Sequence, residues 1–253
     1  YTEGELVAGM FGWQDYAAVD DSVIERRITE AGVPLSASLG VLGLNGVTAY
    51  FGLIEVGQPK KGETVVVSTA AGSVGSCVGQ IANIYGCRSV GIAGGATKTR
   101  ICLETFGFDA AIDYKAGGLD AALASACPDG VDVYFDNTAG PVSDAVLKHL
   151  NVGARVVICG TASVPVWDPI PQGPRVERHL LVKRARMQGF VIFDYAQRYD
   201  EARARLVEWI RAGKVRYRED IMDGLENAPG AIAGLYRGEN LGKRLIRIAD
   251  ENA

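Results

Sequence analysis

Short apolar runs alternate with longer amphipathic segments through the middle of the chain. Residues 64–68, TVVVS, form a continuous β-branched run, as expected for a parallel strand buried on both faces. The next segment, 74–85, has helical spacing and stops before Gly86. The alternation continues, and it predicts strands at 89–93, 110–113, 131–136, 155–159 and 187–193 and helices at 97–106, 119–126 and 142–150.

Strands that alternate with helices of about ten residues indicate βαβ units and a parallel sheet. We therefore expect an α/β fold, a doubly wound Rossmann sheet, over residues 43–211. The flanks differ, because residues 1–25 are Gly-punctuated and strand-like, as in a β-rich domain. Near the end of the chain, a helix is expected at 228–236 and a strand at 244–248. We assign 1–42 and 212–253 to a second unit.

Composition narrows the class of function. The chain is 48% hydrophobic and 22% charged, an ordinary globular balance, and its net charge of −4 argues against nucleic acid as a partner. The basic stretch 175–186 is interpreted as a solvated helix face. No apolar run reaches the roughly 18 residues of a membrane span. The 5 cysteines are scattered and only 2 histidines occur, so we expect reduced thiols, a cytoplasmic location and no metal site.

A glycine turn follows the first buried strand and opens the first helix. It reads Thr69-Ala70-Ala71-Gly72-Ser73-Val74-Gly75, an A-x-G-x-x-G pattern. Gly72 lets the backbone approach a pyrophosphate, and Gly75 lets the helix pack closely on the strand. The helix N-terminus offers free amides to the phosphates. Small residues also occur at tight turns for packing alone, but here strand, turn and helix stand in the order that dinucleotide binding requires.

The end of the second strand indicates which dinucleotide is bound. NAD-binding folds carry an acid about 20 residues beyond the glycines for the ribose 2′-hydroxyl. This chain has Gly94-Gly95-Ala96-Thr97-Lys98 there, with no carboxylate between Gly72 and Lys98. A glycine leaves room for a 2′-phosphate, and Lys98 offers it a charge. The alternative is that Lys98 is an ordinary exposed helix lysine, so the missing acid carries more of the argument for NADPH.

Other strand ends supply further candidates. Asn137 follows the fourth strand and would face the nicotinamide, although strand-end asparagines are often turn residues. Tyr114 closes the third strand and could reach the adenosine or be a simple amphipathic tyrosine. Cys159-Gly160-Thr161 ends the fifth strand, and its glycine allows close approach of the backbone.

Together these residues resemble the zinc-independent medium-chain dehydrogenases/reductases, in the branch of prostaglandin reductases, 2-alkenal double-bond reductases and curcumin reductase. The resemblance covers nearly the whole chain. Strings that carry it, besides the glycine turn, are Gly12-Trp13-Gln14, Gly46–Leu53, Gly107-Phe108-Asp109, Tyr134–Asn137, Ile158-Cys159-Gly160, Gly189-Phe190-Val191 and Asn240-Leu241-Gly242-Lys243.

The resemblance implies roles for individual residues. The turn with Gly72, Ser73, Val74 and Gly75 would hold the pyrophosphate, Lys98 and Tyr114 the 2′-phosphate, and Asn137 and Asn240 the nicotinamide side. Phe193 and Tyr195 fall where family members line the substrate pocket. Tyr50 and Trp167 are added as further candidate substrate residues. The resemblance also implies a homodimer and a GroES-like catalytic domain, with a part of that domain expected ahead of Tyr1.

One position departs from the family pattern. Pro165 stands where the family has a tyrosine that hydrogen-bonds the nicotinamide ribose. Tyr50, Trp167 and Tyr195 are candidate replacements, and we favour Tyr195 as the catalytic donor. The implied activity is NADPH-dependent reduction of the carbon–carbon double bond of a small α,β-unsaturated ketone or aldehyde. The alternatives are an NADPH-dependent quinone oxidoreductase and an NADPH-binding protein without catalysis.

Overall fold

A six-stranded parallel sheet forms the largest unit of the computed structural model, which describes residues 1–249. Its strands lie in the order β5-β4-β3-β6-β7-β8. Their bounds are β3 (Thr64–Ser68), β4 (Arg88–Ala93), β5 (Ala110–Asp113), β6 (Val131–Asp136), β7 (Leu150–Ile158) and β8 (Arg186–Gly189). From β3 the chain adds β4 and β5 on one side and then β6, β7 and β8 on the other, so the strand order reverses between β3 and β6. Doubly wound sheets bind ligands at such a reversal. The predicted doubly wound α/β fold is confirmed.

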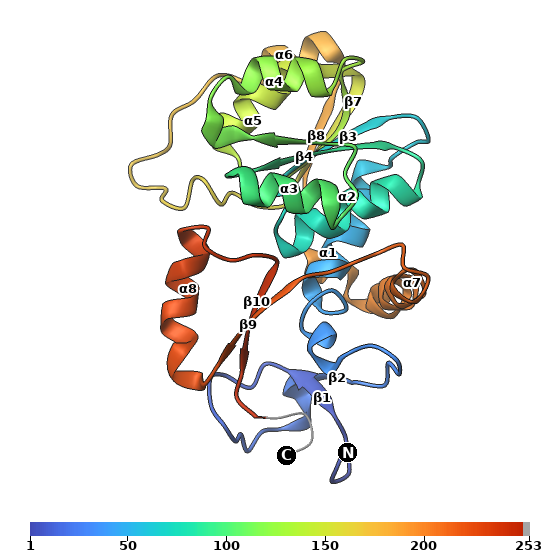
Figure 1. Cartoon of the computed structure of the whole chain (residues 1–253), viewed down its shortest axis with the longest axis vertical. Helices are drawn as coiled ribbons and strands as arrows, with labels where there is room; N and C mark the ends of the chain where they lie inside the picture. Colours follow the sequence, from blue (N-terminus) through green and yellow to red (C-terminus); the bar gives the residue numbers. More distant parts are fainter. Residues whose placement is uncertain (250–253) are drawn as a thin grey trace.

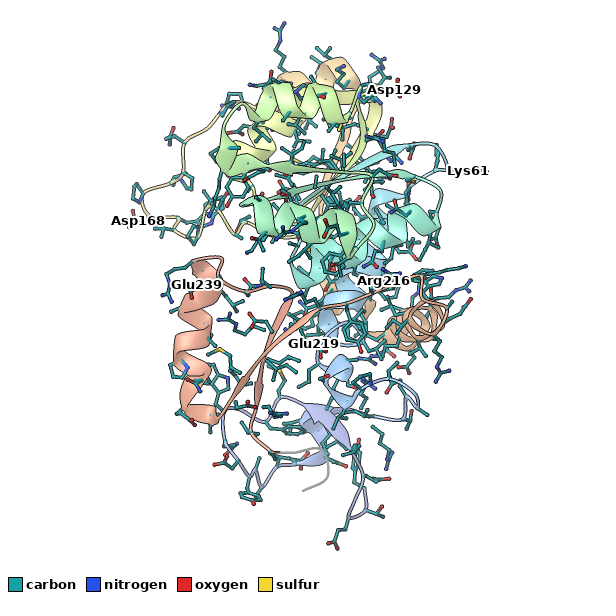
Figure 2. All side chains as sticks on the ribbon, viewed as in Figure 1. Lys61, Asp129, Asp168, Arg216, Glu219 and Glu239 are labelled. Carbon is teal, nitrogen blue, oxygen red and sulfur yellow. The ribbon has the colours of Figure 1, made fainter. Side chains whose placement is uncertain are left out.

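Helices cover both faces of this sheet (Figure 1). They are α2 (Ser73–Ile84) and α3 (Ala96–Glu104) on one face, and α4 (Leu119–Ala126), α5 (Gly140–Val146) and α6 (Glu177–Lys183) on the other. On β3, Val65 and Val67 enter one hydrophobic cluster and Val66 the other. All three are fully buried, which explains the continuous apolar run in the sequence. Side chains fill the layers between sheet and helices (Figure 2).

Two more helices join the cluster on the α2 face. They are α1 (Leu44–Phe51), continued by a π-helical segment at Gly52–Gly57, and α7 (Tyr199–Arg211). Buried side chains from both helices, among them Val47, Phe51 and Leu206, belong to this cluster. Helices α1 and α7 therefore lengthen the hydrophobic core beyond the sheet, toward the two ends of the chain (Figure 1).

The terminal segments lie together beyond α1 (Figure 1). Strands β1 (Val7–Gly9) and β2 (Ile24–Arg27) form an antiparallel pair. Strands β9 (Glu219–Asp223) and β10 (Lys243–Arg247) form a parallel pair joined through α8 (Ala228–Tyr236). The helix and strand expected near the end of the chain are thus present, while the domain limits at 42 and 212 stay a prediction.

Several predicted elements have different bounds in the structure, among them the helix predicted at 142–150, which ends at Val146 and is followed by a 3₁₀ helix at Leu147–His149. The strand predicted at 187–193 ends at Gly189, and Ile192–Arg198 form a 3₁₀ helix instead. The apolar run does not continue as a strand: Phe190 packs against the core, whereas Phe193 is 67% exposed. Strand β7 begins at Leu150, earlier than expected. No helix among residues 1–249 is long and apolar enough to cross a membrane.

Candidate cofactor site

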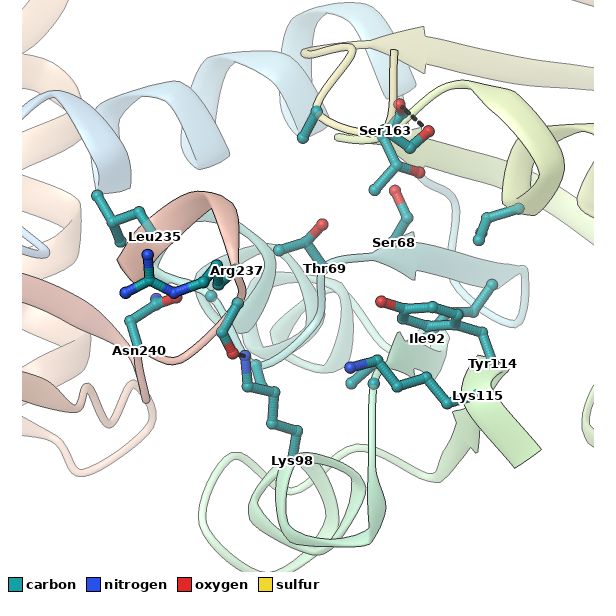
Figure 3. Close-up of a pocket in the computed structure, with 18 of the residues that line it drawn as sticks. Ser68, Thr69, Ile92, Lys98, Tyr114, Lys115, Ser163, Leu235, Arg237 and Asn240 are labelled. Atoms are coloured by element: carbon teal, nitrogen blue, oxygen red, sulfur yellow. Dashed lines mark hydrogen bonds between the residues drawn. The ribbon is translucent and has the colours of Figure 1, made fainter. Parts of the chain in front are cut away.

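A cavity of about 340 Å³ opens at the carboxyl edge of the large sheet, beside the point where chain direction reverses. Its walls come from the ends of β3 and β4, the starts of α2 and α3, and the loops that follow β5, β7 and α8 (Figure 3). Pockets of roughly this volume hold small molecules and cofactors. Segments far apart in the sequence therefore converge on one site.

The glycine turn forms the floor of this cavity. Thr69 takes a left-handed conformation (φ +55°), and its carbonyl accepts a hydrogen bond from the Gly72 N–H at 2.9 Å. A Cβ atom on Gly75 would lie 2.3 Å from the Thr69 carbonyl oxygen, so only glycine fits there. No side chain caps the start of α2, which leaves its first amides and its positive dipole for an anion.

Three cationic side chains line the cavity, Lys98, Lys115 and Arg237, and Arg237 is ion-paired with Glu239 outside the lining. Within the described part of the chain, the lining contains no aspartate or glutamate. This contrasts with the net charge of −4 for the whole chain. A concave site with one sign of charge concentrates ligands of the opposite sign, so the cavity is suited to a ligand with several phosphates.

The end of β4 is crowded by the side chains of Tyr114 and Lys115. A Cβ atom on Gly94 would lie 2.9 Å from Tyr114 Cε1 and 3.0 Å from Lys115 Cε. An acid at this position, as NAD-binding folds require, would therefore displace both neighbours. On α3, Lys98 Nζ donates to the carbonyl of Gly238, which follows α8, at 2.6 Å. Burial, and to a lesser extent Lys115, lowers the pKa of Lys98.

The end of β6 is tied to the end of β3 by hydrogen bonds. The Asn137 side chain donates from Nδ2 to the Ser68 carbonyl at 2.7 Å, and its N–H donates to Ser68 Oγ at 2.8 Å. The buried Asp136 carboxylate accepts from the N–H groups of Thr138 (2.8 Å) and Ala139 (2.9 Å). Asn137 itself does not line the cavity, whereas its neighbour Thr138 does.

The loop after β7 approaches the same edge through its backbone. Cys159 and Gly160 both donate their N–H groups to the Asp136 carbonyl, at 2.8 and 3.1 Å. Burial raises the pKa of the Cys159 thiol to about 12, so this cysteine is not a nucleophile. Thr161 is exposed, and the cavity is lined instead by Ala162 and Ser163.

The C-terminal segment supplies the wall opposite α3. Asn240 lines the cavity, and its Nδ2 donates to the Gly242 carbonyl at 2.7 Å. Gly242 in turn forms a parallel β-bridge with Gly72 of the glycine turn. Of the cofactor residues expected from the sequence, the cavity thus brings together Gly72, Lys98, Tyr114 and Asn240, while Ser73, Val74 and Gly75 form the helix turn beneath it.

The four residues expected for the substrate lie outside this cavity. Tyr195 stacks on Phe51 with ring centroids 4.7 Å apart and an interplanar angle of 13°. The Tyr50 hydroxyl donates to Glu201 Oε1 at 3.2 Å. Trp167 and Phe193 are 64% and 67% exposed. The fold therefore does not gather these four side chains at one point.

Comparison with known proteins identifies the family. A family model described as "Zinc-binding dehydrogenase" matches residues 73–209. The putative NADP-dependent oxidoreductase YfmJ of Bacillus subtilis (strain 168) is 50% identical over 251 residues, which are 98% of this chain and 74% of that protein. The chain belongs to the zinc-binding dehydrogenase family. This confirms the resemblance to the medium-chain dehydrogenases/reductases that the sequence showed.

Other members of the zinc-binding dehydrogenase family agree in sequence and in fold. The 2-alkenal reductase (NADP(+)-dependent) of Nicotiana tabacum is 42% identical over 252 residues, 99% of this chain and 73% of that protein. The crystal structure of CurA from Vibrio vulnificus in complex with NADPH matches with a TM-score of 0.87 at 46% identity, over 94% of this chain and 72% of that one. Despite the family name, residues 1–249 contain no group of three or more His, Cys, Asp or Glu side chains that could hold a metal ion.

Several residues of the site were not identified from the sequence. Lys115 directly follows Tyr114, and Arg237 precedes Asn240 by three positions, so both neighboured predicted residues. Ser163 was also missed, and its Oγ donates to the Thr138 and Ala139 carbonyls at 2.8 and 2.9 Å. Adjacency in sequence could have flagged the two cations, but no sequence signal marks Ser163.

Proposed function

We propose that this protein uses NADPH to reduce the carbon–carbon double bond of a small α,β-unsaturated ketone or aldehyde. The observation that carries the cofactor assignment is the cavity at the carboxyl edge of the sheet, with three cations and no acid in its lining. The relatedness to a 2-alkenal reductase supports the substrate class. The family relationship also supports a dinucleotide in this position, because the related CurA structure contains NADPH.

The residues present fit such a cofactor. The uncapped start of α2 would receive the pyrophosphate, with the bare Gly72 allowing its close approach. Lys98 and Tyr114 would receive the 2′-phosphate beside Gly94. Asn240 stands on the opposite wall, where it would orient the rest of the dinucleotide. The protein thus supplies charge complementarity and a fixed geometry, while the bound nicotinamide supplies the hydride.

Reduction of an enone also needs a hydrogen-bond donor for the carbonyl oxygen, where negative charge develops. We assign this donor to Tyr195. Its ring stacks on Phe51 and meets the edge of Phe190, with the ring centroids of Tyr195 and Phe190 6.4 Å apart. Its hydroxyl has no hydrogen-bond partner among residues 1–249. Tyr50 is a poorer candidate, because its hydroxyl is already bonded to Glu201. Pro165 offers no donor at all.

The activity is tested by following NADPH absorbance when small enones and enals are added to the full-length protein. We expect a saturated ketone or aldehyde as the product, identified by mass spectrometry. An allylic alcohol would show reduction of the carbonyl instead, and turnover of quinones alone to hydroquinones would replace the proposal by quinone reduction. Tight NADPH binding without turnover of any of these substrates would leave a binding protein.

Tyr195→Phe tests the donor. Removal of one preorganised donor costs about a hundredfold in kcat, so we expect a loss of that size with NADPH affinity unchanged. Tyr85→Phe is the control, since it also removes one phenol hydroxyl but from a partly exposed side chain after α2 and outside the cavity, and it should keep kcat within about threefold. Equal kcat for Tyr195→Phe and the parent protein would refute this assignment without touching the reductase proposal.

A further inference from the structure

The two lysines of the cavity are in different states. Lys98 Nζ already donates to the Gly238 carbonyl at 2.6 Å, so this ammonium connects α3 to the loop between α8 and β10. The Lys115 ammonium has no hydrogen bond or ion pair within residues 1–249. Both side chains extend toward the same space, where Tyr114 also points (Figure 3). Lys115 is therefore the cation with its full bonding capacity available.

Lys115 is placed by its surroundings and does not simply extend into solvent. Its N–H donates to Asp113 Oδ1 at 2.9 Å, and the same oxygen accepts from the Gly95 N–H at 2.8 Å. Asp113 thus fixes the turn after β5 against the loop after β4. The Lys115 chain then runs so close to Gly94 that a Cβ atom there would lie 3.0 Å from its Cε atom.

The two ammonium groups also affect each other. The pKa of Lys98 is lowered by burial first and by the charge of Lys115 second. No carboxylate of the cavity lining lies between them to offset this repulsion. An anion bound between Lys98 and Lys115 would remove it, and a phosphate monoester has the charge and the several acceptor oxygens to contact both.

We propose that Lys115 is a further specificity-determining residue for the phosphorylated dinucleotide, while Lys98, besides facing the 2′-phosphate, ties the α8–β10 loop to the cavity. The inference rests on the proposed use of NADPH and goes further, because it adds a second cation to recognition of the 2′-phosphate and gives Lys98 a role in closing the cavity wall. Loss of Lys115 should affect only ligands with a 2′-phosphate, whereas loss of Lys98 should affect every adenosine ligand.

Titration calorimetry on the full-length protein tests the first half, with adenosine 2′,5′-bisphosphate and 5′-AMP as probes that differ only in the 2′-phosphate. Lys115→Met should weaken the bisphosphate about tenfold, the value of one charge-assisted hydrogen bond, and leave 5′-AMP unchanged. Lys115→Arg should restore most of the affinity. Lys61→Met is the control, because exposed Lys61 lies at the opposite end of the sheet (Figure 2).

Lys98→Met tests the second half. It should weaken both probes and increase hydrogen exchange at residues 235–240, whereas Lys115→Met should leave exchange there unchanged. Equal binding of the bisphosphate by Lys115→Met and the parent protein would overturn the inference, and so would an equal loss for 5′-AMP. A parent protein that does not prefer the bisphosphate over 5′-AMP would instead overturn the NADPH assignment itself.

Discussion

At the carboxyl edge of the large sheet, the polar groups after β4 and β5 and those after β6 differ in how many of their hydrogen bonds are made within the protein. At β4 and β5, Lys98, Tyr114 and Lys115 surround Gly94, and the Lys115 cation has no partner in the described chain. At β6, Asp136 is 1% exposed, and its carboxylate accepts from donors that are all part of the protein. Lys115, after β5, can therefore still bind a ligand, whereas the hydrogen bonds of Asp136, at the end of β6, fix the backbone.

The difference follows from burial. A charge can stay unpaired only where solvent or a ligand reaches it, because a buried ionised group without partners is very costly. Asp136 is covered, and its hydrogen bonds hold Ala139 in a left-handed conformation (φ +57°) that a side chain otherwise disfavours. The turn after β6 is therefore a support for the site, and the turn after β5 is part of the site.

Asp136→Ala should have the largest effect. It removes the acceptor of Tyr134 and of the Thr138 and Ala139 N–H groups, leaving buried donors unsatisfied. We expect a loss of about 3–5 kcal/mol in the free energy of unfolding, measured by urea denaturation. Asp129→Ala is the control, because Asp129 is exposed at the far end of the sheet, and should change it by less than about 0.5 kcal/mol.

Gly94→Asp should prevent the residues after β4 and β5 from binding a 2′-phosphate. The new carboxylate would collide with Tyr114 and Lys115 and repel the 2′-phosphate. We expect about a hundredfold weaker NADP⁺ binding in calorimetry, about 2.7 kcal/mol, with NAD⁺ affected much less. Gly94→Ala separates collision from charge, since it introduces only the former. Unchanged NADP⁺ affinity in the aspartate variant would place the 2′-phosphate elsewhere.

Asn137→Ala tests the connection between the end of β6 and the end of β3. Its Nδ2 bond to the Ser68 carbonyl joins β6 to β3, so we expect a loss of about 1–2 kcal/mol in unfolding free energy. Binding of adenosine 2′,5′-bisphosphate should not change, because Asn137 lies outside the cavity. If NADP⁺ alone binds more weakly, Asn137 also contacts the nicotinamide half, as the sequence resemblance implies.

The pH dependence of cofactor preference should show the smallest effect. A phosphate monoester dianion takes up one proton near pH 6 and becomes a monoanion, so the ratio of NADP⁺ to NAD⁺ affinity should fall a few-fold between about pH 7.5 and pH 5. At high pH the same ratio should decline earlier than for an ordinary lysine, because the pKa of Lys98 is lowered, mainly by burial. A ratio independent of pH would show that no dianionic phosphate is recognised.

The sheet could be predicted because its information is local. The strands at Thr64–Ser68, Ala110–Asp113 and Val131–Asp136 have the bounds that their apolar runs indicated. The 3₁₀ helix at Ile192–Arg198 could not be predicted, since its apolar residues have no strand or helix period and its position depends on the stack of Tyr195 on Phe51.

The candidate site was predictable to a similar degree. The glycine turn has a sequence pattern, and Lys98 and Tyr114 could be found from their distance to it. The glycine turn does not lead to Arg237, which only its nearness to Asn240 in sequence could have marked, because it enters the cavity through the pairing of β10 with β9 and the bridge between Gly242 and Gly72. Contacts between residues so far apart leave no trace in local periodicity.

The bridge between Gly72 and Gly242 has a practical consequence for recombining family members. A chimera that takes its nucleotide-binding half from this chain and stops after α7 would inherit the whole large sheet but lack residues 235–240, and with them one wall of the cavity. Such a hybrid would depend on its other parent for those residues. The smallest segment set that transfers the complete cavity therefore includes both the large sheet and the C-terminal residues 235–240.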